Sequence, residues 1–157
     1  ADEHFIDFET TMVALPFHNG RKPYEAIAFQ YSYHFMDEFG NIEHKSQYLN
    51  FEQGVFPNYK FLRELKNDLG GIKGTIFRYH DHENNYLNHL YNQLFVENTN
   101  DVPDKEELMS FIREIATPNS STLGEPWTPK NNMQDLWDFV VQYFWSGDQL
   151  NQIHLNR

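Results

Sequence analysis

Two acidic residues near the N-terminus, Asp7 and Glu9, have the type and spacing of metal ligands. They lie in residues 4–9, where apolar and acidic side chains alternate, and alternation with a period of two predicts a β-strand. On a strand both carboxylates point to one face, and Phe8 between them points to the other. Neighbouring carboxylates repel each other unless a positive charge lies between them, and oxygen ligands suit Mg²⁺ or Mn²⁺. The pattern therefore predicts a metal site, with a solvated acidic strand face as the alternative.

A further acid, Glu83, ends the sequence Tyr-His-Asp-His-Glu at residues 79–83. It follows a short β-rich segment and opens a helical pattern, so it is expected in the first turn of a helix, where the helix dipole favours acids. The ends of strands in such sheets are also places where ligands collect. His80 and His82 could bind a metal, but this segment has no third His and the chain has no Cys. A surface or capping role is therefore favoured for both histidines.

Other residues have two interpretations each. Asp135 is either an acid with a catalytic role or the N-cap of a following helix. Arg21, Lys22 and Arg78 could meet phosphate groups, although solvent exposure is the default for each of them. Tyr31, Tyr33 and Trp127 could stack on bases as in proteins that bind single strands, but core packing is favoured for aromatic rings.

A scaffold of strands and helices must position these residues. Three antiparallel strands are predicted at residues 4–9, 26–35 and 42–51, with a hairpin turn at 36–41. The remaining elements are predicted in this order: a helix from Pro57 to Gly70-Gly71, a buried strand at 74–79, a helix after His82, a helix from Pro103 to Ile115, a loop at 117–132, and a last helix, or a strand end plus helix, at 133–145. The loop is long, so it is expected to be functional, mobile or packed by Trp127. The order of elements predicts an α/β fold in which helices flank a mixed sheet.

The composition is typical of one globular domain over residues 1–157, with 39% hydrophobic and 17% aromatic residues. The absence of Cys excludes a disulfide scaffold and a cysteine nucleophile. No apolar run of about 18 residues and no signal-peptide pattern is found, so we expect no membrane association and a cytoplasmic location. The net charge of −11 does not favour general electrostatic binding of nucleic acid, unless bound divalent cations reverse the local field. Motifs of serine hydrolases, P-loop enzymes and nucleotide dehydrogenases are absent from the sequence.

Residues 5–10, with the sequence Phe-Ile-Asp-Phe-Glu-Thr, resemble the first motif of the DEDD, or DnaQ-like, 3′–5′ exonucleases, which have the ribonuclease-H fold. The segment 76–84 is similar to their second motif, with Glu83 where that motif has Asp. Over residues 4–145 the chain more closely resembles an uncharacterised bacterial domain family of the same clan, in which a segment similar to Asp135-Leu136 leads into a late helix.

The resemblance implies a ribonuclease-H-like mixed sheet, with three antiparallel strands followed by parallel strands. It also implies hydrolysis of nucleic-acid phosphodiesters with two Mg²⁺ or Mn²⁺ ions. Asp7, Glu9 and Glu83 would be the catalytic residues, and the same three acids together with Asp135 would bind the metal. The expected partners are single-stranded DNA or RNA, or another domain of the same chain.

The third motif of these exonucleases, a His or Tyr followed four residues later by Asp, has no match, because Tyr143 and Asp148 are five residues apart. The chain is therefore expected to be a fragment of a longer protein that is truncated before the last helix of the fold. Two alternatives remain open. One is a catalytically inactive ribonuclease-H-like module that binds a protein partner, and the other is a metal-dependent hydrolase of small phosphate compounds.

Overall fold

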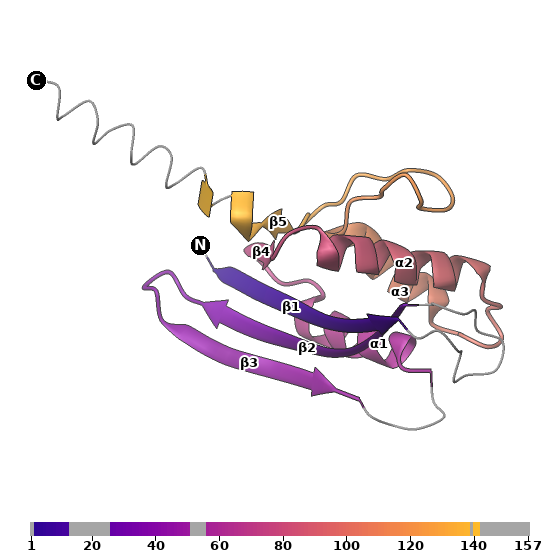
Figure 1. Cartoon of the computed structure of the whole chain (residues 1–157), viewed down its shortest axis with the longest axis horizontal. Coiled ribbons are helices and arrows are strands. Elements are labelled where there is room, and N and C mark those ends of the chain that lie inside the picture. The colour runs from indigo at the N-terminus through magenta and orange to yellow at the C-terminus, as the bar shows by residue number, and fades with distance from the viewer. Residues whose placement is uncertain (1, 13–25, 51–55, 139, 142–157) are drawn as a thin grey trace, which may run out of the picture.

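A five-stranded mixed sheet forms the centre of the protein (Figure 1). The computed structural model describes residues 2–12, 26–50, 56–138 and 140–141. The strands are β1 (Glu3–Met12), β2 (Ala26–Met36), β3 (Ile42–Leu49), β4 (Thr75–Arg78) and β5 (Gln134–Asp135), in the spatial order β3-β2-β1-β4-β5. β1, β2 and β3 pair antiparallel, whereas β4 pairs parallel to β1 and β5 parallel to β4. The α/β fold with a mixed sheet that the sequence predicts is confirmed.

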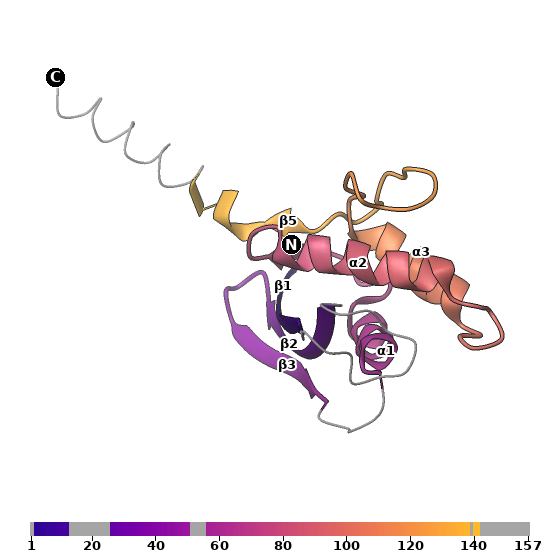
Figure 2. The ribbon, with the colours of Figure 1, turned by 45° about the vertical axis from the view of Figure 1, so that its right-hand side comes forward.

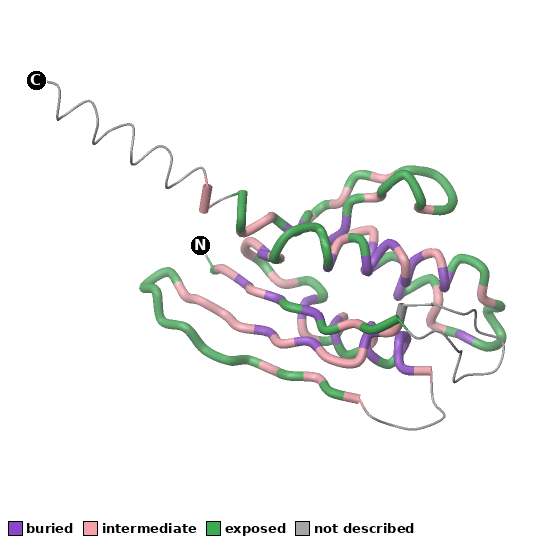
Figure 3. Tube along the Cα trace, viewed as in Figure 1, coloured by how far each residue is buried: buried purple, intermediate pink, exposed green. Residues whose placement is uncertain are grey.

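Three helices cover one face of this sheet (Figure 2). They are α1 (Asn58–Leu69), α2 (His82–Val96) and α3 (Lys105–Ile115). The alternation in β1 has the predicted effect, because Ile6 and Phe8 are buried toward the helices whereas Asp7 and Glu9 are exposed (Figure 3). The ring of Phe8 meets the ring of Phe61 from α1 edge to face, with centroids 5.1 Å apart. The sheet and the helices thus share one aromatic-rich core, as the composition predicts.

The element boundaries follow local signals in the sequence. α1 begins directly after Pro57, as predicted, and ends at Leu69 before Gly70. Gly71 then adopts a positive φ of 72°, a conformation that glycine reaches without strain. The prediction of a strand end plus helix at residues 133–145 is correct for its described part, since β5 is followed by helical residues 136–138 and 140–141. Residue 51, predicted as the end of the third strand, lies outside the described residues, and so do Arg21 and Lys22.

The long loop at residues 117–132 is packed against α2 and not left free. Asn88 and Asn92 of α2 donate hydrogen bonds of 2.8 Å to backbone carbonyls of the loop. Trp127 is partly buried, and its Nε1 donates to the carbonyl of Ala116 at 2.8 Å. Of the three predictions for this loop, packing by Trp127 is confirmed. Among the described helices, none is both long enough and apolar enough to span a bilayer.

Candidate functional site

The first turn of α2 lies beside the second half of β1. The pairing of β1 with β4 ends at Phe5 opposite Phe77, so from there onward this edge of β1 has no neighbouring strand in the described chain. The carboxylate of Glu83 lies at this edge, close enough to the backbone N–H of Phe8 for that group to lower its pKa. At the same edge His82 Nε2 lies 3.4 Å from Thr10 Oγ1.

Glu83 is the most perturbed acid of this edge, since only 1% of its surface is exposed. The pKa of its carboxyl is raised from 4.5 to about 7, mainly by burial and also by the negative charge of nearby Asp7. The backbone N–H groups of Glu83 and Phe8 and the charge of Arg78 act in the opposite direction and lower this pKa. The second carboxylate oxygen, Oε2, is buried and has no hydrogen-bond partner in the described structure. Glu83 is therefore a buried acid with one oxygen available for a proton or a cation.

The structure brings Asp7 close to Glu83 but does not gather all the predicted acids. The electrostatic effect on the Glu83 pKa shows that Asp7 is near Glu83. Glu9 is exposed one strand step further along, on the same face as Asp7. Within the described ranges, no three His, Asp or Glu side chains are arranged so that they could hold a metal ion together. Of the four predicted metal ligands, Asp7 and Glu83 are thus near enough for their charges to interact, but no three of the described acids gather around one point.

Asp135 has the contacts of a helix N-cap. Its Oδ1 accepts the backbone N–H of Trp137 at 2.8 Å, which is the capping bond of the helical residues that follow. The same oxygen accepts the backbone N–H of His80 at 3.3 Å, and Oδ2 lies 3.4 Å from Nη1 of Arg78. Both oxygens of Asp135 are therefore already occupied. Of the two interpretations of Asp135 from the sequence, these contacts agree with the helix N-cap.

Arg78 is the residue of this edge that sequence reasoning placed wrongly. It was expected to be exposed, but its side chain is only 13% exposed. Its Nη1 forms ion pairs with Asp81 at 3.0 Å and with Asp135 at 3.4 Å, and it also donates to the carbonyl of His80. His80 has a φ of 60°, a strained value for a residue other than glycine. The sequence signal that could have indicated these ion pairs is the position of Arg78 at the end of a strand, directly before an acid-rich turn.

A cavity of about 270 Å³ opens beside these residues, on the face of the sheet opposite the helices. Asp7 and Arg78 form part of its wall, and Ser32 of β2 adds a hydroxyl group. The rings of Phe5 and Phe77 stack at 5.3 Å between centroids and line the apolar part. The cavity thus combines an acid, a guanidinium group and an apolar surface.

The aromatic residues proposed for base stacking have other environments. Tyr31 and Tyr33 are buried in the main core. Tyr31 donates a hydrogen bond of 2.5 Å to Asp68, and burial raises its pKa far above the usual value. Core packing is thus the correct interpretation for Tyr31 and Tyr33, and His80 and His82 are exposed, in line with the surface role favoured for them.

A family model described as a domain of unknown function (DUF2779) matches residues 4–150. The chain belongs to this family. The expectation of an uncharacterised domain family is thereby confirmed. Comparison with curated proteins and comparison with solved structures each gave no significant match. The matched range of the DUF2779 domain contains Asp7, Glu9, Glu83 and Asp135.

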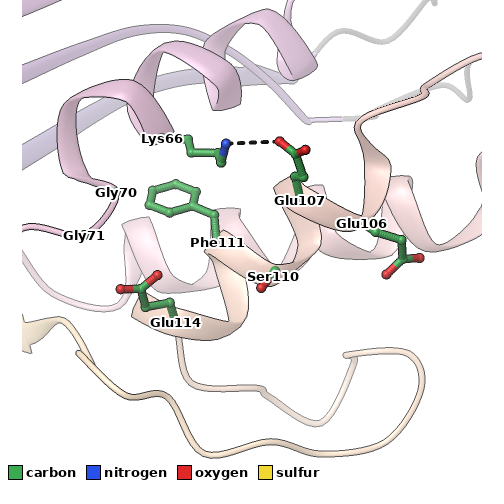
Figure 4. A pocket seen from close by; sticks show the side chains of 8 residues that line it. All are labelled: Lys66, Gly70, Gly71, Glu106, Glu107, Ser110, Phe111 and Glu114. Atoms are coloured by element: carbon green, nitrogen blue, oxygen red, sulfur yellow. Dashed lines mark hydrogen bonds and ion pairs between the residues drawn. The ribbon is translucent and has the colours of Figure 1, made fainter.

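The DUF2779 domain has a second, larger cavity of about 590 Å³ between the end of α1 and the outer side of α3 (Figure 4). Three glutamates of α3 lie around it: Glu106, Glu107 and Glu114. Lys66 of α1 faces Glu107 at 3.4 Å, and both side chains are accessible to solvent. The ion pair of this cavity is therefore exposed to water, unlike the buried carboxyl of Glu83.

Proposed function

We propose that this DUF2779 domain is a divalent-cation-dependent phosphodiesterase of the DEDD 3′–5′ exonuclease type, acting on single-stranded DNA or RNA. The observation that carries the proposal is the carboxyl of Glu83. It is buried near Asp7 and the N–H of Phe8, and one of its oxygens has no partner in the described structure. A buried acid with an unpaired oxygen is costly, and strongly perturbed acids of this kind are found preferentially at functional sites.

The strand order supports the proposal. Three antiparallel strands followed by two parallel ones, in the order β3-β2-β1-β4-β5, make the kind of sheet that the ribonuclease-H-like resemblance implies. Asp7 lies on the central strand β1, and Glu83 follows its parallel neighbour β4. Ligands of open α/β sheets collect outside the carboxyl ends of parallel strands, where this pair of acids lies.

The residues fit a divalent cation in part. The oxygens of Asp7 and Glu83 are the ligand type that Mg²⁺ and Mn²⁺ prefer, and a cation would offset both the burial of Glu83 and its repulsion by Asp7. Glu9 is the third candidate ligand, because it lies on the same face of β1 as Asp7. Asp135 fits less well, since Arg78 and two backbone N–H groups occupy its oxygens. In the proposal Asp135 is a positioning residue that holds Arg78 and the turn at His80.

Bound Mg²⁺ or Mn²⁺ would supply an activated water and stabilise the leaving oxygen of the phosphodiester. The residues of the chain have distinct tasks around it. The N–H of Phe8 favours the ionised form of Glu83, and the buried guanidinium of Arg78 balances part of the negative charge of the acids. Asp7, which is exposed and forms part of the wall of the smaller cavity, is the acid that a substrate would reach first.

The test compares Asp7→Asn and Glu83→Gln with Glu106→Gln, an isosteric change in the larger acidic cavity. We expect each of the first two variants to lose Mn²⁺ binding by calorimetry and to lose digestion of single-stranded DNA by about a hundredfold or more, the usual scale for a group that stabilises the reaction electrostatically. Glu106→Gln should behave as the unchanged chain. Digestion that persists in Asp7→Asn would overturn the proposal.

A catalytically inactive module that binds a protein partner is the second candidate. It is favoured by the lack of a three-residue metal group in the described ranges and by Arg78, a built-in cation among the acids. In this case the unchanged chain shows no heat with Mn²⁺, and Asp7→Asn leaves partner binding intact. Calorimetry on the unchanged chain therefore separates the two candidates before any digestion assay.

A further inference from the structure

Two histidines on neighbouring strands form a pair that the proposed function does not use. His34 of β2 and His44 of β3 lie directly opposite each other in the register of the two strands. Their ring centroids are 4.7 Å apart, and Nε2 of His34 lies 3.1 Å from Nδ1 of His44. β3 is an edge strand of the described sheet (Figure 1), and His44 is exposed. Two ring nitrogens are therefore close together at a position that dissolved ions can reach.

An irregularity in the pairing of β2 with β3 brings these two side chains together. Tyr33 pairs with Ser46, and the next residue, His34, pairs with His44, so Lys45 is an extra residue in β3. In a regular antiparallel ladder Lys45 would lie opposite His34, because the partners advance by one residue in each strand. A β-bulge changes the direction of a side chain, and bulges are over-represented next to active sites. Here the bulge puts an imidazole in the place of an ammonium group.

The distance between the two nitrogens is that of two ligands on one cation. Imidazole nitrogens bind Zn²⁺ at about 2.0–2.1 Å. Two nitrogens 3.1 Å apart can both lie at this distance from one point, and the angle between the two bonds is then about 100°. This angle lies between the octahedral and tetrahedral values of about 90° and 109°. The pair can therefore hold a cation without a change in its spacing.

The charges around the histidine pair favour a bound cation. The ammonium group of Lys45 lies 2.7 Å from the carboxylate of Glu43 and 5.1 Å from the ring centroid of Phe35. Its positive charge is therefore offset by a neighbour. Asp7 and His34 form part of the wall of the same cavity of about 270 Å³, so a negative charge lies on that side. The net charge of −11 also attracts cations to the chain as a whole.

We propose that His34 and His44 together bind one transition-metal cation of the kind that prefers imidazole ligands, which includes Zn²⁺, Cu²⁺ and Ni²⁺. In the metal-free chain one of the two facing nitrogens carries a proton and donates it to the other. When the cation binds, that ring carries its proton on its other nitrogen, so both facing lone pairs bind the cation. Water occupies the remaining positions, since the described ranges contain no group of three His, Asp or Glu side chains able to hold a metal ion.

The site is separate from the acids of the proposed nuclease function. Mg²⁺ and Mn²⁺ prefer carboxylate oxygens such as those of Asp7 and Glu83, whereas Zn²⁺ binds well to imidazole nitrogens. The proposal rests on the geometry of the histidine pair and on the bulge that creates it. It therefore does not depend on whether the chain digests nucleic acid.

The test is a calorimetric titration of the full chain of 157 residues, without a polyhistidine tag, with ZnCl₂. The unchanged chain is compared with His34→Gln, with His44→Gln and with the double variant. The matched control combines His80→Asn and His82→Gln, which also removes two histidines that are exposed. Asn is chosen at position 80 because it tolerates the positive φ of that residue.

We expect the unchanged chain and the control to bind one Zn²⁺ with equal affinity. Each single variant should bind at least about tenfold more weakly, because even the loss of a group that supports a metal ligand costs about 10–100-fold. The double variant should bind about as weakly as either single variant, since one imidazole alone cannot chelate the ion. An unchanged affinity in the double variant, or an equal loss in the control, would overturn the proposal.

Urea denaturation shows whether the variants still fold. In EDTA, His44→Gln should unfold at the same urea concentration as the unchanged chain, because substitutions at exposed positions change stability little. Excess Zn²⁺ should raise this concentration for the unchanged chain and not for His44→Gln, because the ion binds only the paired strands of the folded state. No rise in the unchanged chain would contradict the proposal. Mn²⁺ binding, which tests the acids, is measured separately, so failure of this proposal is distinct from failure of the proposed function.

Discussion

Two of the cavities in the described part of this protein differ in the environment of the acids near them. The larger one, between α1 and α3, has three glutamates around it, and Lys66 pairs with one of them in solvent. The smaller one lies at the parallel half of the sheet, near a single buried glutamate. Neither the volume of a cavity nor the number of acids around it distinguishes a candidate functional site from ordinary protein surface. The burial of the acid distinguishes them, because burial makes the ionised form of Glu83 costly while the glutamates of α3 remain hydrated.

Arg78 and Lys66 extend this comparison to the basic residues. Arg78 is largely buried and holds Asp81, Asp135 and a backbone carbonyl, whereas Lys66 makes one exposed ion pair at 3.4 Å. An exposed pair gains little from Coulomb attraction in water, but a buried guanidinium is part of the structure around it. Removing the charge of Arg78 should therefore lower the free energy of unfolding more than removing the charge of Lys66, even without any metal or substrate.

The largest effect is expected from Glu83→Gln as a function of pH, measured by chemical denaturation in buffer with EDTA. The pKa of Glu83 is raised to about 7 in the folded chain, against 4.5 as its ordinary value. A raised carboxyl pKa stabilises the fold fully below about pH 4.5, and this contribution is lost as the pH rises through about 7. The unchanged chain should therefore lose about 3 kcal/mol relative to Glu83→Gln between pH 4.5 and 8, at 1.36 kcal/mol per pKa unit. A constant difference between the two proteins across this range would contradict the burial argument.

A second, smaller effect is expected from Arg78→Met, a change that keeps much of the side-chain volume. Removing the guanidinium leaves Asp135 without its ion pair at a largely buried position, so the free energy of unfolding should fall by about 2 kcal/mol at pH 7. The matched change in the other region is Lys66→Met. Urea denaturation of both variants tests the comparison, and an equal loss in the two would show that the guanidinium of Arg78 is effectively solvated.

The smallest effect is expected from Glu107→Gln in the larger cavity. The partner of Glu107 is the exposed Lys66, so removing the charge should change the free energy of unfolding by less than about 0.5 kcal/mol. The change should also disappear in high salt, because salt screens exposed charges. A loss above 1 kcal/mol that resists salt would mean that this cavity is less hydrated than the exposure of its acids indicates.

The sequence by itself determined the faces and ends of the elements. Alternation in β1 correctly separated Asp7 and Glu9 from Ile6 and Phe8, because successive side chains of a strand must point to opposite faces. Pro57 correctly marked the start of α1, because proline restricts the backbone of its own position wherever the rest of the chain lies. These properties depend on neighbours in sequence, so one segment carries the whole signal. The close placement of Asp7 and Glu83 was also expected, but it came from the resemblance and not from spacing.

Only the tertiary structure decided which groups meet at the edge of the sheet. Glu83 comes near Phe8 where the pairing of β1 with β4 has ended at Phe5, and nothing in either segment alone specifies that register. Arg78 is buried because Asp135 of β5, 57 residues further along the chain, lies directly opposite it in the sheet. Burial and ion pairing depend on segments that are distant in sequence. The pKa of Glu83 and the environment of Arg78 therefore exist only once those segments have packed together.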